Sequence, residues 1–126
     1  MSGAPDHSPT AIIVAGDDQT RMLLRALVQL HHIWVEGEAA GETYALELVR
    51  AYSPSLLVVD SGLAEGSSDD LVCRARALVP KIRVVLVTPG SHPHSLPMKP
   101  AEQPDSTLLR PFRFPEFVRA LGPLCD

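Results

Sequence analysis

Short apolar runs alternate along this chain with segments whose apolar residues recur at helical spacing. A run of about four to eight residues rich in Ile, Val and Leu predicts a β-strand, because helices are usually longer. Apolar residues that recur at i, i+4 and i+7 instead predict a helix that turns one face to a core. We therefore expect strands at 11–15, 33–39, 55–60, 82–88 and 107–110, and helices at 19–31, 42–51, 68–78 and 114–124.

The predicted helices carry start signals and apolar stripes. Asp17 or Asp18 can cap the first helix, because a side-chain oxygen there accepts hydrogen bonds from the free N–H groups of the first turn. Within this helix Leu23, Leu27 and Leu30 form one stripe that we expect to face the core. The residues expected to face inward on the later helices are Ala45, Leu46, Val49 and Tyr52, then Leu71, Ala75 and Leu78, and finally Phe117, Val118 and Leu121.

The alternation of strands and helices predicts an α/β fold with a parallel sheet covered on both faces. Five strands in this pattern fit the flavodoxin-like, doubly wound order 2-1-3-4-5. One segment interrupts the rhythm, since residues 89–106 contain five prolines in 18 residues. Proline removes a helical hydrogen bond and disfavours a helix interior by about 3 kcal/mol. A proline-rich loop is therefore expected where a fourth helix would precede the last strand.

Composition agrees with one globular domain at 11–126, preceded by a loose tail at 1–10. The chain has 126 residues, of which 45% are apolar, and a net charge of −4. This charge predicts no nucleic-acid surface, and no apolar run approaches the roughly 18 residues of a membrane span. Cys73 and Cys125 are too few for a disulfide framework or a zinc site. We expect a cytoplasmic protein.

Polar residues stand where several predicted strands end. Asp60 closes the third strand, Thr88 the fourth and Arg110 the fifth. Function in such sheets gathers at the carboxyl ends of the strands, which meet at one edge. A carboxylate beside a hydroxyl and a cation can accept a phosphoryl group, whose new oxygens the other two groups would bind. The plainer interpretation, an acid that only shapes a turn, fits Asp60 equally well.

Five segments in order resemble the receiver domain of bacterial two-component response regulators over residues 11–121. They are "AIIVA", "QTRMLLRAL", "GETYALELVRAYSPSLLVVD", "VVLVT" and "LLRPF". The resemblance implies that Asp60 is the phospho-acceptor position and Thr88 the switch hydroxyl. It also places Arg110 where the family carries a lysine.

The chain departs from the family at the remaining site positions. The family's two metal-binding acids fall on Ala15 and Gly16, while Asp17 lies one place further along. Magnesium prefers several oxygen ligands, so Asp60 with Asp17 is the one alternative set, and no cofactor is expected. Thr107 occupies the family's switch-aromatic position. Arg110 either pairs with Asp60 or points to solvent while Asp60 binds its own turn; the residues alone leave both open.

The leading functional hypothesis is a stand-alone, receiver-like signalling domain that acts by protein–protein contact without magnesium-dependent aspartyl phosphorylation. It is not expected to be an enzyme. Its partner would be a histidine kinase or a downstream signalling protein, and a homodimer is left open. The contact surface would be the last helix with the proline-rich segment, or the first helix. Two alternatives remain: a working phospho-acceptor phosphorylated at Asp60 by a histidine kinase, and a small α/β ligand-binding domain.

Overall fold

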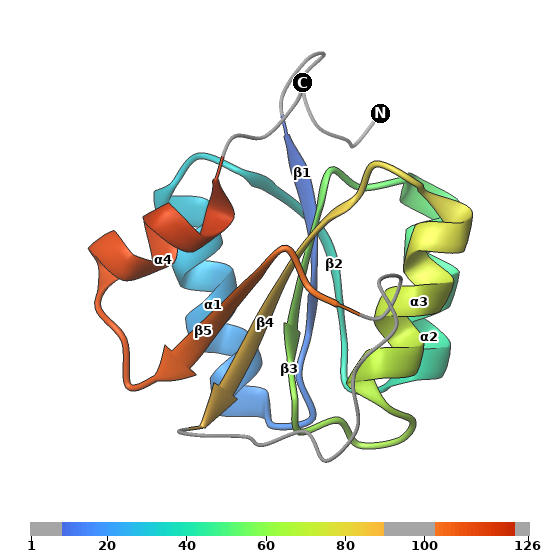
Figure 1. Cartoon of the computed structure of the whole chain (residues 1–126), viewed down its shortest axis with the longest axis horizontal. Coiled ribbons are helices and arrows are strands. Elements are labelled where there is room, and N and C mark those ends of the chain that lie inside the picture. The colour runs from blue at the N-terminus through green and yellow to red at the C-terminus, as the bar shows by residue number, and fades with distance from the viewer. Residues whose placement is uncertain (1–8, 90–102, 123–126) are drawn as a thin grey trace.

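Five parallel strands and four helices make up the described part of the chain, residues 9–89 and 103–122 of this computed structural model. The sheet order β2-β1-β3-β4-β5 (Figure 1) confirms the predicted flavodoxin-like, doubly wound fold. The strands are β1 Thr10–Val14, β2 Trp34–Ala39, β3 Leu56–Asp60, β4 Arg83–Pro89 and β5 Ser106–Arg110. The helices are α1 Asp18–Leu30, α2 Glu42–Tyr52, α3 Ser68–Leu78 and α4 Phe114–Leu121.

Strands β1 and β3 form the centre of the sheet. They pair in parallel register from Ala11 opposite Leu56 to Val14 opposite Val59, and all four of these residues are fully buried. A central parallel strand is covered on both faces, which is why neither sequence alternates between apolar and polar residues. The apolar run of β3 ends at Asp60, which therefore lies at the carboxyl edge of the sheet.

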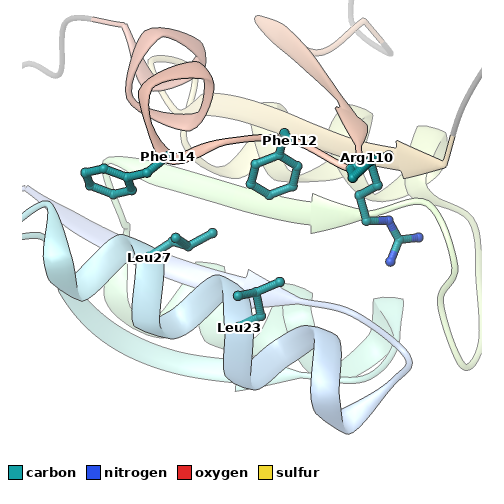
Figure 2. A pocket seen from close by; sticks show the side chains of 6 residues that line it. Leu23, Leu27, Arg110, Phe112 and Phe114 are labelled. Carbon is teal, nitrogen blue, oxygen red and sulfur yellow. The ribbon is translucent and has the colours of Figure 1, made fainter.

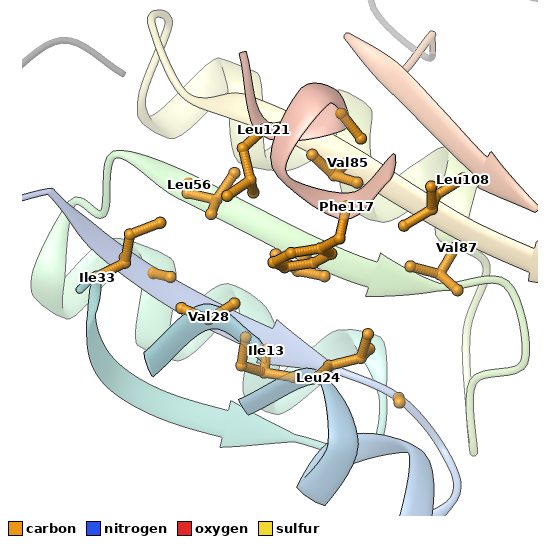
Figure 3. Packing of buried hydrophobic residues seen from close by; sticks show 14 residues of the cluster. Ile13, Leu24, Val28, Ile33, Leu56, Val85, Val87, Leu108, Phe117 and Leu121 are labelled. Carbon is orange, nitrogen blue, oxygen red and sulfur yellow. The ribbon is translucent and has the colours of Figure 1, made fainter. Parts of the chain in front are cut away.

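Helices α1 and α4 cover one face of the sheet, and α2 and α3 cover the other (Figure 1). Phe117 of α4 packs with Leu24 of α1 and Ile13 of β1 on the first face (Figure 3). Ile12, the neighbour of Ile13, belongs to the cluster on the opposite face, with Leu71 of α3. Successive strand residues point to opposite faces, so one apolar strand contributes to two cores.

The prediction for the buried face of α1 was wrong. Leu24 and Val28 are buried, whereas the predicted stripe lies largely in solvent: Leu23 is 51% and Leu30 66% exposed, and Leu27 is half-buried. The helix carries two apolar rows about 100° apart, and only one of them can face the sheet. Periodicity within α1 does not tell which row this is.

Arg21 explains the rotation of α1. Its Nη1 donates a 2.7 Å hydrogen bond to the carbonyl oxygen of Ala15, at the end of the buried first strand segment. Leu24 and Val28 follow Arg21 by three and seven positions, so they share its helix face. Anchoring Arg21 toward the sheet therefore turns Leu24 and Val28 inward.

Smaller corrections concern the other helices. Tyr52 and Leu78, expected to face inward, are exposed at the last position of α2 and of α3. Leu48 is buried instead, and a Cβ added at Gly37 would lie 3.1 Å from its methyl groups. The space that Leu48 occupies thus depends on the missing side chain of Gly37 in β2. The sequence of α2 alone therefore does not predict that Leu48 is buried. On α4 Phe117 and Leu121 are buried as predicted, while Val118 is only half-buried.

Two predictions fall mainly outside the described residues. They are the proline-rich loop within 89–106 and the tail at 1–10, although Thr10 already belongs to β1.

Phe117→Ala is expected to lower the free energy of unfolding by about 3–5 kcal/mol, because it removes a fully buried ring from the core. Phe114→Ala is the matched control: its ring is 39% exposed, and the loss should stay below about 1.5 kcal/mol. Urea denaturation followed by circular dichroism measures both. Equal losses would contradict the packing described here.

Candidate functional site

The carboxyl ends of β3, β4 and β5 bring three of the predicted site residues to one edge. Asp60 is the last residue of β3 and Arg110 the last residue of β5, while Thr88 stands one place before the end of β4. The parallel register aligns these ends, since Asp60 lies opposite Val87 and Thr88 opposite Leu109.

Asp60 is only 5% exposed; its Oδ2 is hydrogen-bonded, whereas its buried Oδ1 makes no hydrogen bond and has only an ion-pair contact. Oδ2 accepts a 2.9 Å hydrogen bond from the backbone N–H of Gly62, and Oδ1 lies 3.2 Å from Nη2 of Arg110. Of the two arrangements left open by the sequence, the structure has the pair between Arg110 and Asp60, and Arg110 does not simply point to solvent. Asp60 also makes the hydrogen bond to its own turn that the other arrangement contained. A buried carboxylate without such partners would be strongly destabilising.

The hydroxyl of Thr88 is buried and is engaged by a residue that sequence reasoning missed. Ser61, directly after Asp60, donates a 3.3 Å hydrogen bond from its hydroxyl to Oγ1 of Thr88. The backbone N–H of Ser61 donates to the carbonyl oxygen of Val87. Residues 61–67 form the β3–α3 loop. Its first residue, Ser61, is thus bound to β4 through both its main chain and its side chain.

The β3–α3 loop also lies directly against Gly16. The N–H of Gly16 donates a 2.8 Å hydrogen bond to the carbonyl oxygen of Gly62. A Cβ added at Gly16 would lie 2.8 Å from that oxygen and 2.9 Å from the nitrogen of Ala64. Real Cβ atoms do not come this close to backbone atoms, so a carboxylate at position 16 would require the loop to move. The neighbouring Ala15 is fully buried in the core.

Asp17, the alternative metal ligand, is used by the helix that follows it. Its Oδ2 accepts hydrogen bonds from the N–H of Thr20 at 2.9 Å and from the Thr20 hydroxyl at 3.0 Å. The Thr20 N–H, followed by the Thr20 hydroxyl, holds the pKa of the Asp17 carboxyl below its usual value of 3.8. Asp17 is therefore the N-cap of α1, one of the two capping residues predicted, while Asp18 pairs with Arg21.

Two glutamates that sequence reasoning missed hold the β3–α3 loop on the start of α2. Glu42, the first residue of α2, is buried, and its Oε1 accepts a 3.1 Å hydrogen bond from the N–H of Ser67. Glu65 in the loop accepts a 2.7 Å hydrogen bond from the N–H of Thr43. Glu42 of α2 thus binds an N–H at the start of α3, and Glu65, which precedes α3, binds an N–H in the first turn of α2. No local signal marks this exchange, because the partners are 25 and 22 positions apart.

An apolar groove lies beside the site, between α1 and the segment that joins β5 to α4 (Figure 2). Leu23 and Leu27 line one side, and Phe112 and Phe114 lie opposite. The groove encloses about 500 Å³. Arg110 connects it to the site, because Arg110 is one of the lining residues of the groove while its guanidinium points away from the two rings and pairs with Asp60.

The remaining predicted residue, Thr107, lies exposed on β5 opposite Leu86. Within residues 9–89 and 103–122, no three His, Cys, Asp or Glu side chains are grouped so that they could hold a metal ion. In the same described part of the chain, no helix is long and apolar enough to cross a membrane.

Arg110→Ala is expected to lower the free energy of unfolding by about 2 kcal/mol, because it leaves the Asp60 carboxylate without a counter-charge. This is less than the 3–5 kcal/mol of a fully buried pair, since 34% of the Arg110 side chain is exposed. In an Asp60→Asn background the same substitution should cost about 1 kcal/mol or less. A double-mutant cycle by urea denaturation measures the coupling, and equal losses in both backgrounds would show that the ion pair contributes nothing.

Asp17 should make stability depend on pH in the acid range. A carboxyl whose pKa is lowered by folding stabilises the fold above its unfolded pKa, and this contribution is lost as the pH falls through the folded pKa. The Tm of the wild type should therefore exceed that of Asp17→Asn at about pH 6, with the difference shrinking below pH 3.8. A difference that stays constant down to about pH 2.5 would contradict this assignment.

Known structures share this fold, although their sequences are only distantly similar. No family model and no curated protein matches the sequence. Among solved structures, the chemotaxis protein CheY4 of Vibrio cholerae is similar with a TM-score of 0.79 at 16% identity, over 90% of this chain and 96% of that one. The receiver domain of PhyR from Erythrobacter litoralis has a TM-score of 0.74 at 24% identity, over 90% and 87%.

A third similar structure is the receiver domain of AraT, a response regulator from Geobacillus stearothermophilus. Its TM-score is 0.73 at 20% identity, and the match covers 89% of this chain and 88% of that one. At these identities the similarity establishes the fold: the chain folds like a response-regulator receiver domain.

Proposed function

We propose that this chain is a receiver-fold signalling module that acts by contact with other proteins and is not switched by magnesium-dependent phosphorylation of Asp60. The observation that carries the proposal is the position of the β3–α3 loop. Its backbone lies against Gly16, in the space where the second acid of a receiver metal site would begin. Such a site would need this acid to help hold the ion.

The environment of Asp60 supports the same conclusion. Phosphoryl transfer depends on positioning and on a cation that neutralises the incoming group. Here Arg110 is the counter-charge of Asp60, and the Gly62 N–H binds the second carboxylate oxygen. Asp17, the remaining nearby acid, caps α1 instead. Neither oxygen of Asp60 is therefore free to act as a nucleophile or as a metal ligand without breaking an existing contact.

The residue that would transmit a change at Asp60 to the protein surface also differs from that of the family. Thr107 stands exposed on β5 where the resemblance places a switch aromatic, and its short side chain cannot alternate between a buried and an exposed ring position. In this proposal the fold serves as a scaffold, and its surface has the same shape whether or not a phosphodonor is present.

The groove between α1 and the β5–α4 connection is the contact surface we assign. Leu23 is 51% exposed at its side, and Phe114 is 39% exposed opposite. Grouped exposed apolar side chains of this kind mark interaction sites. The surface includes the first helix and the start of the last one, and the partner class is a histidine kinase or a downstream signalling protein.

Intact-mass measurement after incubation with acetyl phosphate and Mg²⁺ tests this function. We expect no phosphoryl adduct on the wild type, because positions 15 and 16 supply no acids to hold a metal ion that would neutralise the donor, and Asp17 caps α1. An unrelated receiver with both acids present, treated in the same way, confirms that the donor is active, and circular dichroism confirms that the chain is folded.

An adduct that disappears in Asp60→Ala would overturn the proposal and establish the alternative, a working phospho-acceptor. A phosphoryl adduct of the same extent in Asp60→Ala would place the phosphoryl group on another residue, and an acetyl adduct, which differs in mass, would reflect acylation of surface amines; both leave the proposal for Asp60 standing.

A further inference from the structure

One charged side chain lies among the apolar side chains that line the groove. Of the described lining residues, Arg110 carries a charge, and the others are two leucines, two phenylalanines and a proline. No acid belongs to this described lining. A segment that enters the groove therefore contacts an apolar surface and one guanidinium.

The guanidinium of Arg110 has unused hydrogen-bonding capacity. A guanidinium carries five N–H donors. Within residues 9–89 and 103–122, the one polar contact of Arg110 is the 3.2 Å ion pair of its Nη2 with Oδ1 of Asp60, and its Nε is buried without a hydrogen-bond partner. Because 34% of the side chain is exposed, an acceptor from outside can reach the guanidinium. A carboxylate is the acceptor that fits it best, since its two oxygens match two parallel N–H groups of arginine.

A second cation stands beside the groove. Arg113 lies between the lining residues Phe112 and Phe114 in the chain, is exposed, and makes no ion pair within the part of the chain that the structure describes. Glu116 accepts a 3.0 Å hydrogen bond from the Arg113 N–H and so serves the start of α4. Asp60 already balances part of the charge of Arg110, and Arg113 supplies further positive charge. The wall formed by the β5–α4 connection therefore attracts an acid and repels a base.

The apolar and the charged parts lie at opposite ends of the groove. Phe114 and Leu27 lie at one end and the guanidinium of Arg110 at the other, with Leu23 and Phe112 between them (Figure 2). Leu23 and Leu27 are four positions apart on α1, which is about 6 Å along the helix. An apolar side chain and an acid that occupy the two ends must therefore lie at least about 6 Å apart. Residues i and i+2 of an extended segment, about 6.4–6.8 Å apart on one face, meet this spacing.

We propose that the groove binds an acidic, apolar segment of the partner protein, with a large apolar side chain between Leu27 and Phe114 and a carboxylate on Arg110. The inference rests on the proposed function, in which this groove is the contact surface, and it names the chemistry of the segment that the partner supplies. The argument for this occupant is charge complementarity, because the described lining holds a guanidinium and no acid. The volume of about 500 Å³ lies within the range of roughly 300–1,000 Å³ found for ligand sites.

Two blocked tripeptides that differ in one charge test the proposal. The probes are acetyl-Trp-Ala-Glu-amide and acetyl-Trp-Ala-Gln-amide, each added to the ¹⁵N-labelled wild type and followed by two-dimensional NMR. We expect the glutamate peptide to shift the amides of Leu23, Leu27 and Phe112 with a Kd of about 1–10 mM, a weak affinity because a short flexible peptide must be ordered on binding. The glutamine peptide should bind about fivefold more weakly, because a neutral amide replaces a charge-assisted hydrogen bond at a partly exposed site.

Variants at the charged end assign the preference to Arg110. In Asp60→Asn the preference for the glutamate peptide should exceed fivefold, because the guanidinium no longer balances a carboxylate of its own chain. Adding Arg110→Gln in this background should remove the preference, and this double variant leaves no buried carboxylate without a counter-charge. Arg50→Gln is the matched control: it removes the same charge from an exposed arginine on α2, on the opposite face of the sheet (Figure 1), and should leave the preference at about fivefold.

A leucine pair on α1 tests the apolar part of the groove. Leu23→Ala should weaken both peptides by about threefold, because Leu23 lines the groove. Leu30→Ala is the matched control, since Leu30 is an exposed leucine of the same helix outside the described lining, and it should leave both Kd values unchanged.

Three results would overturn the proposal: equal Kd values of the two peptides for the wild type, no saturable shift of the groove amides, or a preference that survives in Asp60→Asn, Arg110→Gln. None of these results bears on phosphorylation. A phosphoryl adduct that depends on Asp60 would instead overturn the proposed function and would leave the preference for the glutamate peptide as measured.

Discussion

The buried charge of Asp60 is the constraint that connects the site, the loop and the groove. A carboxylate at the end of a central strand cannot stay charged without partners, and here they are Arg110 and the N–H of Gly62. The bond to Gly62 draws the β3–α3 loop over the edge of the sheet, where it meets Gly16. The pair with Asp60 fixes Arg110, which is also one of the residues that line the groove. One carboxylate thus shapes three neighbouring features.

The β3–α3 loop is held from its other end by a different set of charges. Glu42 and Glu65 each bind an N–H at the start of the opposite segment, and Arg74 lies 3.4 Å from Glu42. Gly66 makes this possible: its φ is +81°, and a Cβ there would lie 2.4 Å from Oε1 of Glu42. The loop is therefore fastened at both ends. This explains how its backbone can occupy the space beside Gly16 that a metal-binding acid would need.

Helix α1 contributes both to the hydrophobic core and to the surface that we assign to protein contact. One of its faces, with Leu24 and Val28, closes the core, while another presents apolar side chains to solvent next to the groove. In the proposed function the sheet supports this surface, and the acid at the strand end has a structural role. Signalling then depends on which protein meets the surface and at what concentration.

The sequence by itself determined the elements and their arrangement. Apolar runs and helical stripes are local patterns, so they predicted the five strands, the four described helices and the strand order, and they placed Asp60, Thr88 and Arg110 at one edge. The tertiary structure alone decided which row of α1 is buried, because both rows have helical periodicity and the bond from Arg21 to Ala15 selects one. It also decided that Asp60 binds both Arg110 and its own turn, and that Glu42 and Glu65 hold the loop. The pair of Asp60 with Arg110 and the contacts of Glu42 and Glu65 join residues at least 22 positions apart, and local patterns carry no information about such contacts.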